Sequence, residues 1–264
     1  MAGILSNFIR CTMQKFLKFL QDNIFNAFII FIVFLTVIPI LAPLFQALGI
    51  EFLANAIYAT FKFSCHQFHW RSVHFFDYQV AWCTRDMFIW IGFLGVALAV
   101  KFKFIKKSLA WYWIVPFTIP LALDGGVQTI ATIIGFGSNE QFYLATNLTR
   151  MITGSIFGMG LGIVIAGFLQ EEEMLSRQDN LIKPNENKHI KQNYLTLFGQ
   201  LTLIFLSMLI LYIILVWIWK ISSPNYPPSG LFDDITRKAP QVQTWQMHRG
   251  DHSQKNWFVE QDNE

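Results

Sequence analysis

Long apolar stretches separated by short polar segments fill most of this chain. A membrane-spanning helix needs roughly 20 apolar residues. On that basis we predict spans at residues 24–45, 87–100, 109–123, 151–169 and 195–219. The apolar stretches 50–63 and 127–136 are too short to cross and predict half-helices or interfacial helices. The pattern therefore predicts an all-α polytopic transmembrane bundle of about five spans.

Polar or amphipathic segments flank this apolar region. Residues 1–22 place apolar and basic side chains at helical spacing and predict an amphipathic helix in the membrane interface. Residues 23–220 form the predicted transmembrane domain, and residues 221–264 a polar tail outside the membrane. Inside the first span, Pro39 and Pro43 are expected to kink or end the helix.

Composition and charge agree with a membrane protein. Hydrophobic residues make up 53% of the chain and charged residues 14%, against about 25% charged in soluble domains. The net charge of +3 is small and gives no reason to expect nucleic-acid binding. Lys and Arg gather in the segments around residues 10–18, 101–107 and 177–191. Cytoplasmic loops carry such an excess, which predicts a cytoplasmic N-terminus and an outer C-terminus in a bacterial inner membrane.

Polar residues at the ends of the apolar stretches form the candidate site. With the predicted orientation all of them lie near the outer face, although they are far apart in sequence. They are Cys65, His66, Gln67, Arg71, Cys83, Arg85, Asp86, Asp124, Gln128 and Arg150. Ionisable groups at membrane depth are costly and usually have both a partner and a function.

The cysteines of this set leave three interpretations open. On the outer side, Cys65 and Cys83 can oxidise to a disulfide. With His66 and Asp86 they also offer the ligand types that zinc or iron accepts. The third interpretation is free thiols that only pack. The chain has no Cys-x-x-Cys-His motif, which argues against haem.

The remaining features have structural and functional interpretations. Arg71, Arg85 and Arg150 can pair with Asp86 and Asp124 to lock the helices together, or one arginine can bind an anionic group. Residues 124–126, Asp-Gly-Gly, suggest a tight turn or a broken helix after a span. Small residues four apart predict a close helix-packing face. These are Gly154, Gly158 and Gly162.

The order of the motifs resembles that of a family of uncharacterised prokaryotic membrane proteins. The motifs are Cys-His-Gln at 65–67, Arg-Ser at 71–72, Cys-x-Arg at 83–85, Asp-Gly-x-x-Gln at 124–128 and Arg-x-x-Thr-Gly at 150–154. The resemblance covers about residues 60–165 and implies that these polar residues belong together, without supplying an activity. Asp86 stands where the family has the second cysteine of Cys-x-Arg-Cys, which argues against paired-thiol redox chemistry.

Three functions remain as hypotheses. The first is a non-catalytic accessory subunit of a larger respiratory or photosynthetic membrane complex, contacting lipids and partner subunits. The second is a membrane enzyme or a metal or redox protein that uses the outer Cys/His/Asp/Arg site. The third is a transporter or lipid-binding protein that uses Arg150 and Asp124.

Overall fold

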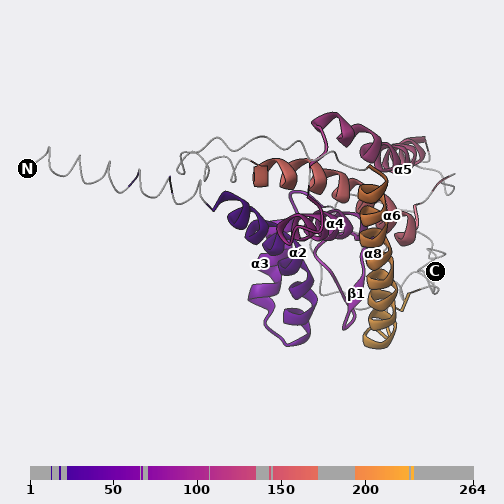
Figure 1. Ribbon diagram of the computed structural model, residues 1–264. Coiled ribbons are helices and arrows are strands. Elements are labelled where there is room, and N and C mark those ends of the chain that lie inside the picture. Colours follow the sequence, from indigo (N-terminus) through magenta and orange to yellow (C-terminus); the bar gives the residue numbers. More distant parts are fainter. Residues whose placement is uncertain are drawn as a thin grey trace, which may run out of the picture.

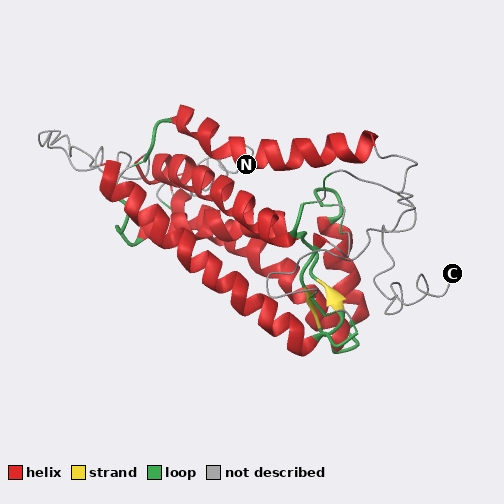
Figure 2. Cartoon of the chain, turned by 90° about the vertical axis from the view of Figure 1, so that its right-hand side faces the viewer, coloured by secondary structure: helices red, strands yellow, loops and turns green. Residues whose placement is uncertain are grey.

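The computed structural model describes residues 23–65, 67, 71–106, 108–134, 143, 145–171, 194–225, 227 and 228, with Met13 and Lys18. The predicted amphipathic helix and most of the polar tail lie outside these residues. The elements are α2 (Ile24–Ala47), α3 (Glu51–Phe61), β1 (His74–Phe75), β2 (Tyr78–Gln79), α4 (Thr84–Lys101), η2 (Trp111–Trp113), α5 (Ile114–Ile134), α6 (Asn147–Leu161), η3 (Gly162–Ala166) and α8 (Tyr194–Ser222). Helices dominate, and the short hairpin lies toward one end of the bundle (Figure 1, Figure 2).

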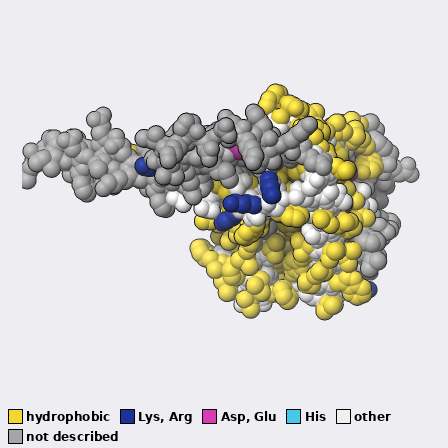
Figure 3. All heavy atoms as spheres, in the orientation of Figure 1, with side chains coloured by type: hydrophobic (Ala, Val, Ile, Leu, Met, Phe, Trp, Pro, Cys, Tyr) yellow, Lys and Arg dark blue, Asp and Glu magenta, His cyan; other side chains and the backbone are white. Residues whose placement is uncertain are grey.

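Four helical segments are long and apolar enough to cross a membrane. They are Ile24–Ala47, Trp111–Ala131, Asn147–Glu171 and Tyr194–Ser222. The remaining predicted span, residues 87–100, corresponds to the 18-residue helix α4, which carries Arg85 and Asp86 in its first turn and packs mainly against α6. These helices confirm an all-α membrane helix bundle. Hydrophobic side chains cover most of the described face in Figure 3, as lipid-facing helices require.

Glycines let α4 and α6 approach closely. A Cβ added at Gly158 would lie 2.1 Å from the Ile89 carbonyl oxygen, and one at Gly154 would lie 2.5 Å from the Arg85 carbonyl oxygen. Gly162, one turn further along, faces Val96 in the same way. Larger residues at these positions would force the two helices apart.

Helix α2 does not end at its prolines, although the sequence allowed an end there. It continues through Pro39 and Pro43 to Ala47. Because proline has no N–H, the carbonyl groups of Leu35 and Pro39 lack the usual donor four residues later. Trp82 Nε1 donates to the Leu35 oxygen at 2.9 Å, and the Ala81 N–H donates to the Pro39 oxygen at 3.2 Å. The segment before α4 therefore satisfies both carbonyls and is held against α2.

The predicted break at residues 124–126 is wrong. Helix α5 runs without interruption from Ile114 to Ile134 and joins what the sequence divided into a span and a half-helix. Glycine inside a helix costs about 1 kcal/mol relative to alanine but does not by itself stop the helix. A Cβ added at Gly125 would lie 3.4 Å from Arg85 Nη1, close to ordinary van der Waals contact.

A two-stranded hairpin that the sequence did not predict packs against the end of α8. Its register pairs His74 with Gln79 and Phe75 with Tyr78. The two turn residues, Phe76 and Asp77, both have positive φ, at 56° and 66°. Two-residue turns of this kind favour Asn-Gly, so Phe-Asp carried no turn signal. Asp77 accepts from the backbone and side-chain nitrogens of Asn225, just after α8, at 2.9 and 2.8 Å.

Candidate functional site

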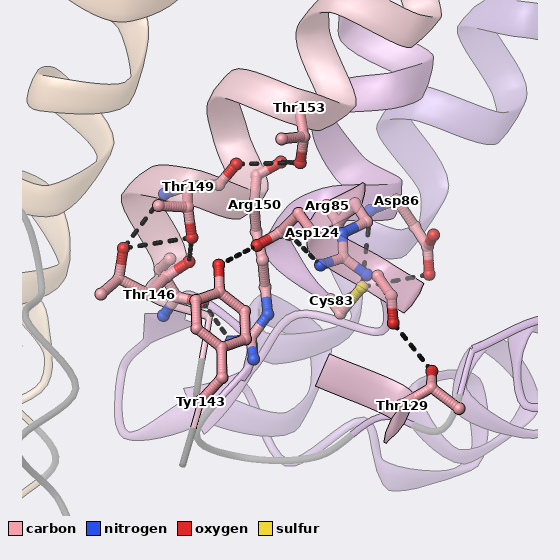
Figure 4. Close-up of polar contacts among 12 residues, drawn as sticks. Cys83, Arg85, Asp86, Asp124, Thr129, Tyr143, Thr146, Thr149, Arg150 and Thr153 are labelled. Carbon is pink, nitrogen blue, oxygen red and sulfur yellow. Dashed lines mark hydrogen bonds and ion pairs between the residues drawn. The ribbon is translucent and has the colours of Figure 1, made fainter. Parts of the chain in front are cut away.

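The described residues of the predicted site come together around the first turns of α4 and α6 and the middle of α5 (Figure 4). His66 lies outside the described residues. The others fall into three adjoining groups: an ion pair at Arg85, a guanidinium–amide group at Arg150, and a sulfur–carboxylate group at Cys83.

The ion pair joins α4 to α5. Arg85 Nη2 contacts Asp124 Oδ2, and the Tyr143 hydroxyl donates to the other carboxylate oxygen of Asp124. The Arg85 and Asp124 side chains are 19% and 7% exposed. Both oxygens of this mostly buried carboxylate therefore have partners, and the charge of Asp124 is matched by Arg85.

Arg150 occupies the first turn of α6 and is 1% exposed. Its Nη1 donates to Asn147 Oδ1 at 3.2 Å, one helical turn earlier. The Gln128 amide is best oriented with its oxygen toward two guanidinium groups, where it accepts from Arg150 Nη2 and Arg71 Nη2, each at 3.1 Å. One neutral amide oxygen thus bridges two buried cations that come from different parts of the chain.

The sulfur–carboxylate group lies at the start of α4. Cys83 is the N-cap of the helix, and its Sγ donates to Asp86 Oδ2 at 3.2 Å and accepts from the Asp86 N–H at 3.5 Å. The Cys83 N–H donates to Cys65 Sγ at 3.1 Å. Both cysteines are free thiols here, Cys65 buried and Cys83 partly buried. One donor atom from each of Cys65, Cys83 and Asp86 lies within 4.8 Å of the other two.

Gln67 has a structural position beside these groups. It is 2% exposed, and its Nε2 donates to the carbonyl oxygens of Tyr58 at 2.9 Å and Ala81 at 3.2 Å. Its own carbonyl oxygen accepts from Gln79 Nε2 at 2.9 Å. These bonds tie α3, the hairpin and the segment before α4 into one framework.

The three groups influence one another electrostatically. Arg71 interacts with the cysteines and with Arg85, and Arg150 interacts with Arg71, Arg85 and Asp124. Burial, together with the neighbouring Arg85 charge, lowers the pKa of the Arg71 guanidinium. The hydrogen bond with the Cys83 thiol, together with burial, raises the pKa of the Cys65 thiol. The site is thus one electrostatic unit.

Contacts along α8 show how deep the site lies. Tyr212 packs edge-on against Phe88 with ring centroids 5.7 Å apart, whereas Trp219 stacks on His74 and Ser222 binds the hairpin turn. Residues 83–86 precede Phe88 by at most about one and a half helical turns and so lie between these two levels. The site is therefore recessed below the hairpin end of the bundle.

Sequence reasoning missed two partners of the site. Asn147 was visible as a polar residue three positions before Arg150, a spacing at which helical side chains meet. Tyr143 had no comparable signal because it lies outside the predicted spans and has no helical spacing to Asp124. Its contact with Asp124 follows only from the way α5 and α6 pack.

Residues 65–164 match a model of a family described as "Predicted membrane protein (DUF2085)". The matched segment contains every residue of the predicted site, from Cys65 to Arg150. It supports the resemblance to an uncharacterised membrane protein family and, with the apolar helices, a membrane location. No curated protein and no solved structure matches the chain.

Chemically, the site combines three guanidinium groups, two carboxylates and two thiols. The guanidinium groups are suited to binding oxyanions, since the planar fork matches phosphate and carboxylate. The sulfur–carboxylate group is suited to binding a soft or borderline metal ion.

Proposed function

We propose that this membrane protein binds an anionic group, either a phosphate ester or a carboxylate, at Arg150, Arg71 and Gln128. The observation that carries the proposal is the environment of Arg150. This guanidinium is almost fully buried at the start of a candidate span, and its hydrogen-bond partners among the described residues are the neutral amides of Asn147 and Gln128.

A buried cation is expensive unless an opposite charge compensates it. The nearby Asp124 supplies little of that charge, because its two oxygens are directed to Arg85 and Tyr143. Intramembrane ionisable residues that lack a full charge partner commonly mark the position of a ligand. An anion at this position would supply the missing negative charge.

The geometry also favours an oxyanion. Arg150 and Arg71 both direct an Nη2 to one acceptor atom, the Gln128 oxygen. A phosphate or carboxylate oxygen at that point would receive the same two hydrogen bonds, and each would be stronger because the acceptor is charged. Gln128 would then act as a placeholder whose amide turns aside when the anion binds.

The source of the anion is either a lipid headgroup or a free solute. Extensive apolar surface on the described helices makes lipid contact a general property of the molecule. The accessory-subunit hypothesis depends mainly on the segments 1–22 and 221–264, which lie largely outside the described residues, and it stays a prediction.

Thermal unfolding in detergent tests the proposal. The wild-type protein is titrated with inorganic phosphate, acetate, phosphatidylglycerol and, as the zwitterionic control, phosphatidylcholine. A ligand at ten times its Kd should stabilise the protein by about 1.4 kcal/mol, a rise in Tm of about 3–6 °C. A rise with phosphatidylglycerol alone identifies a lipid headgroup, and a rise with the small anions identifies a solute.

The variants are Arg150→Gln and, as the matched control, Lys101→Gln, which removes an exposed cation at the other end of α4. The anion-induced rise should disappear in Arg150→Gln and persist in Lys101→Gln. Should no anion shift the wild-type Tm, or should Arg150→Gln respond like the wild type, the proposal is wrong.

A further inference from the structure

We infer that Cys65, Cys83 and Asp86 form a binding site for one divalent transition-metal ion, and that zinc fits this donor set best. The three donor atoms belong to different side chains from those that bind the anion, although Arg71 lies beside both groups. Two thiolates with one carboxylate are ligands that zinc accepts, whereas magnesium and calcium prefer oxygen ligands alone.

The spacing of the three donor atoms suits a tetrahedral ion. With Zn–S bonds of about 2.3 Å, two sulfurs of a tetrahedral site lie about 3.8 Å apart. Here all three donor atoms lie within 4.8 Å of one another, with Cys83 Sγ and Asp86 Oδ2 3.2 Å apart. Shifts of roughly 1 Å or less would bring them to zinc-binding distances.

Backbone and capping hydrogen bonds position the segment that carries these donors. Ala81 and Trp82 are hydrogen-bonded to the proline-freed carbonyls of α2. Cys83 then caps α4, and Asp86 follows within the first helical turn. The Cys83 N–H donates to Cys65 Sγ at 3.1 Å. A hydrogen bond of this kind would also support a thiolate at Cys65.

Metal binding requires deprotonated ligands. The hydrogen bond with Cys83, together with burial, raises the pKa of the Cys65 thiol, so the ion itself has to displace that proton. The helix N-terminus and a nearby guanidinium would then stabilise the negative charge of the ligands. Cys83 lies at the N-terminus of α4, where the helix dipole stabilises negative charge. The Arg71 guanidinium interacts favourably with both cysteines. A zinc ion with two thiolates and one carboxylate has a net charge of −1, which the neighbouring Arg71 guanidinium would balance.

Three protein ligands leave one tetrahedral position open, as in zinc sites that bind water or a further ligand. His66, which the sequence grouped with these residues, lies outside the described residues, and the inference does not depend on it. The same atoms permit two rival states, a Cys65–Cys83 disulfide or two free thiols, and the experiment must separate all three.

The first measurement uses the wild-type full chain, purified in mild detergent without chelator. Elemental analysis should find about one zinc per chain. Differential alkylation followed by mass spectrometry should find Cys65 and Cys83 protected, and a zinc chelator should expose both. Chelator-sensitive protection supports a metal. A metal-free protein with alkylated cysteines, or with a mass loss corresponding to a disulfide, overturns the inference.

Variants locate the site. Cys65→Ser, Cys83→Ser and Asp86→Asn should each lower zinc occupancy, about tenfold for the cysteines because a thiolate ligand is lost. Cys11→Ser, which removes the third cysteine of the chain, is the matched control and should keep the wild-type occupancy. Lys101→Gln, at the other end of α4, should keep it as well. If both cysteine variants keep full occupancy, the zinc is bound elsewhere and the assignment is wrong.

Discussion

Trp82 donates its indole N–H to the main-chain carbonyl of Leu35, 47 positions earlier, at 2.9 Å. That carbonyl is available because Pro39 cannot donate to it within α2. The bond fixes the residue immediately before Cys83 against the first span. A proline inside a membrane helix therefore helps to position the start of α4 and, with it, the candidate site.

A double-mutant cycle tests this dependence. Trp82→Phe should destabilise the protein because the partly buried Leu35 carbonyl loses its donor, at a cost of about 1–3 kcal/mol. In a Pro39→Ala background, the alanine introduced by the substitution has an N–H that can donate to the same carbonyl. The cost of Trp82→Phe should then fall by about 1 kcal/mol, measured by thermal unfolding in detergent.

Trp113→Phe is the control for this cycle, since Trp113 packs on Tyr194 and Phe198 away from α2. Its cost should be the same in the wild-type and Pro39→Ala backgrounds. Equal costs for Trp82→Phe in the two backgrounds would show that the indole bond does not compensate for the proline.

The ion pair between Arg85 and Asp124 gives a second prediction. Asp124→Asn leaves a mostly buried guanidinium without its charge partner and should destabilise the protein by about 3 kcal/mol. The double variant Arg85→Met, Asp124→Asn removes both charges and should recover much of the lost Tm. If the double variant is less stable than Asp124→Asn alone, Arg85 has a stabilising role that does not depend on Asp124.

The fold could be predicted from hydrophobic pattern because span length and apolarity are local properties. The same reasoning failed where contacts between distant segments determine whether a helix continues or a turn forms. Nothing near Pro39 indicates that residues 81 and 82 will supply donors, so a helix end was a reasonable expectation. At residues 124–126 the glycines suggested a break, whereas the helix continues through them to Ile134. The hairpin was missed because each strand has two residues and its turn is Phe-Asp.

For the candidate site, sequence reasoning identified the polar residue types but not their partners. It grouped Arg85, Asp124 and Arg150 because polar residues at the ends of apolar stretches stand out. It left open which arginine pairs with which acid, since that depends on how α4, α5 and α6 pack. Arg85 contacts Asp124, and Arg150 contacts amides. The accessory-subunit, metal and orientation hypotheses remain predictions.

The packing of α4 on α6 gives a third prediction. Gly158→Ala should destabilise the protein by about 1–3 kcal/mol because the new methyl group overlaps the Ile89 carbonyl. Gly199 in α8 has no atom within 4 Å of an added Cβ. Gly199→Ala should therefore leave the free energy of unfolding unchanged or raise it by up to about 1 kcal/mol, because alanine has the higher helix propensity. Thermal unfolding of both variants in the same detergent measures the two effects. If both variants lose the same stability, the overlap with the Ile89 carbonyl is not the cause of the loss in Gly158→Ala.

The orientation in the membrane can be tested with single added cysteines. Glu51 begins α3 beyond the far end of α2, and Lys101 ends α4 at the basic segment. In intact cells a membrane-impermeant thiol reagent should label Glu51→Cys above the background of the unchanged chain. Lys101→Cys should be labelled only after permeabilisation. The reverse pattern would place the basic segment and the N-terminus outside.

A substitution in the hairpin turn is expected to stabilise the protein. Phe76 has a φ of 56°, a conformation that costs a bulky residue about 1 kcal/mol and that asparagine adopts more readily. The backbone N–H of residue 76 donates to Ser222 Oγ at 3.4 Å, and an asparagine at this position keeps that N–H group. Phe76→Asn should therefore raise Tm by about 2–4 °C. Phe63→Asn, which removes another exposed ring at a residue without positive φ, controls for the lost apolar surface. If both variants lower Tm equally, the prediction is wrong. The Phe76 ring then contributes more to stability than the positive φ costs.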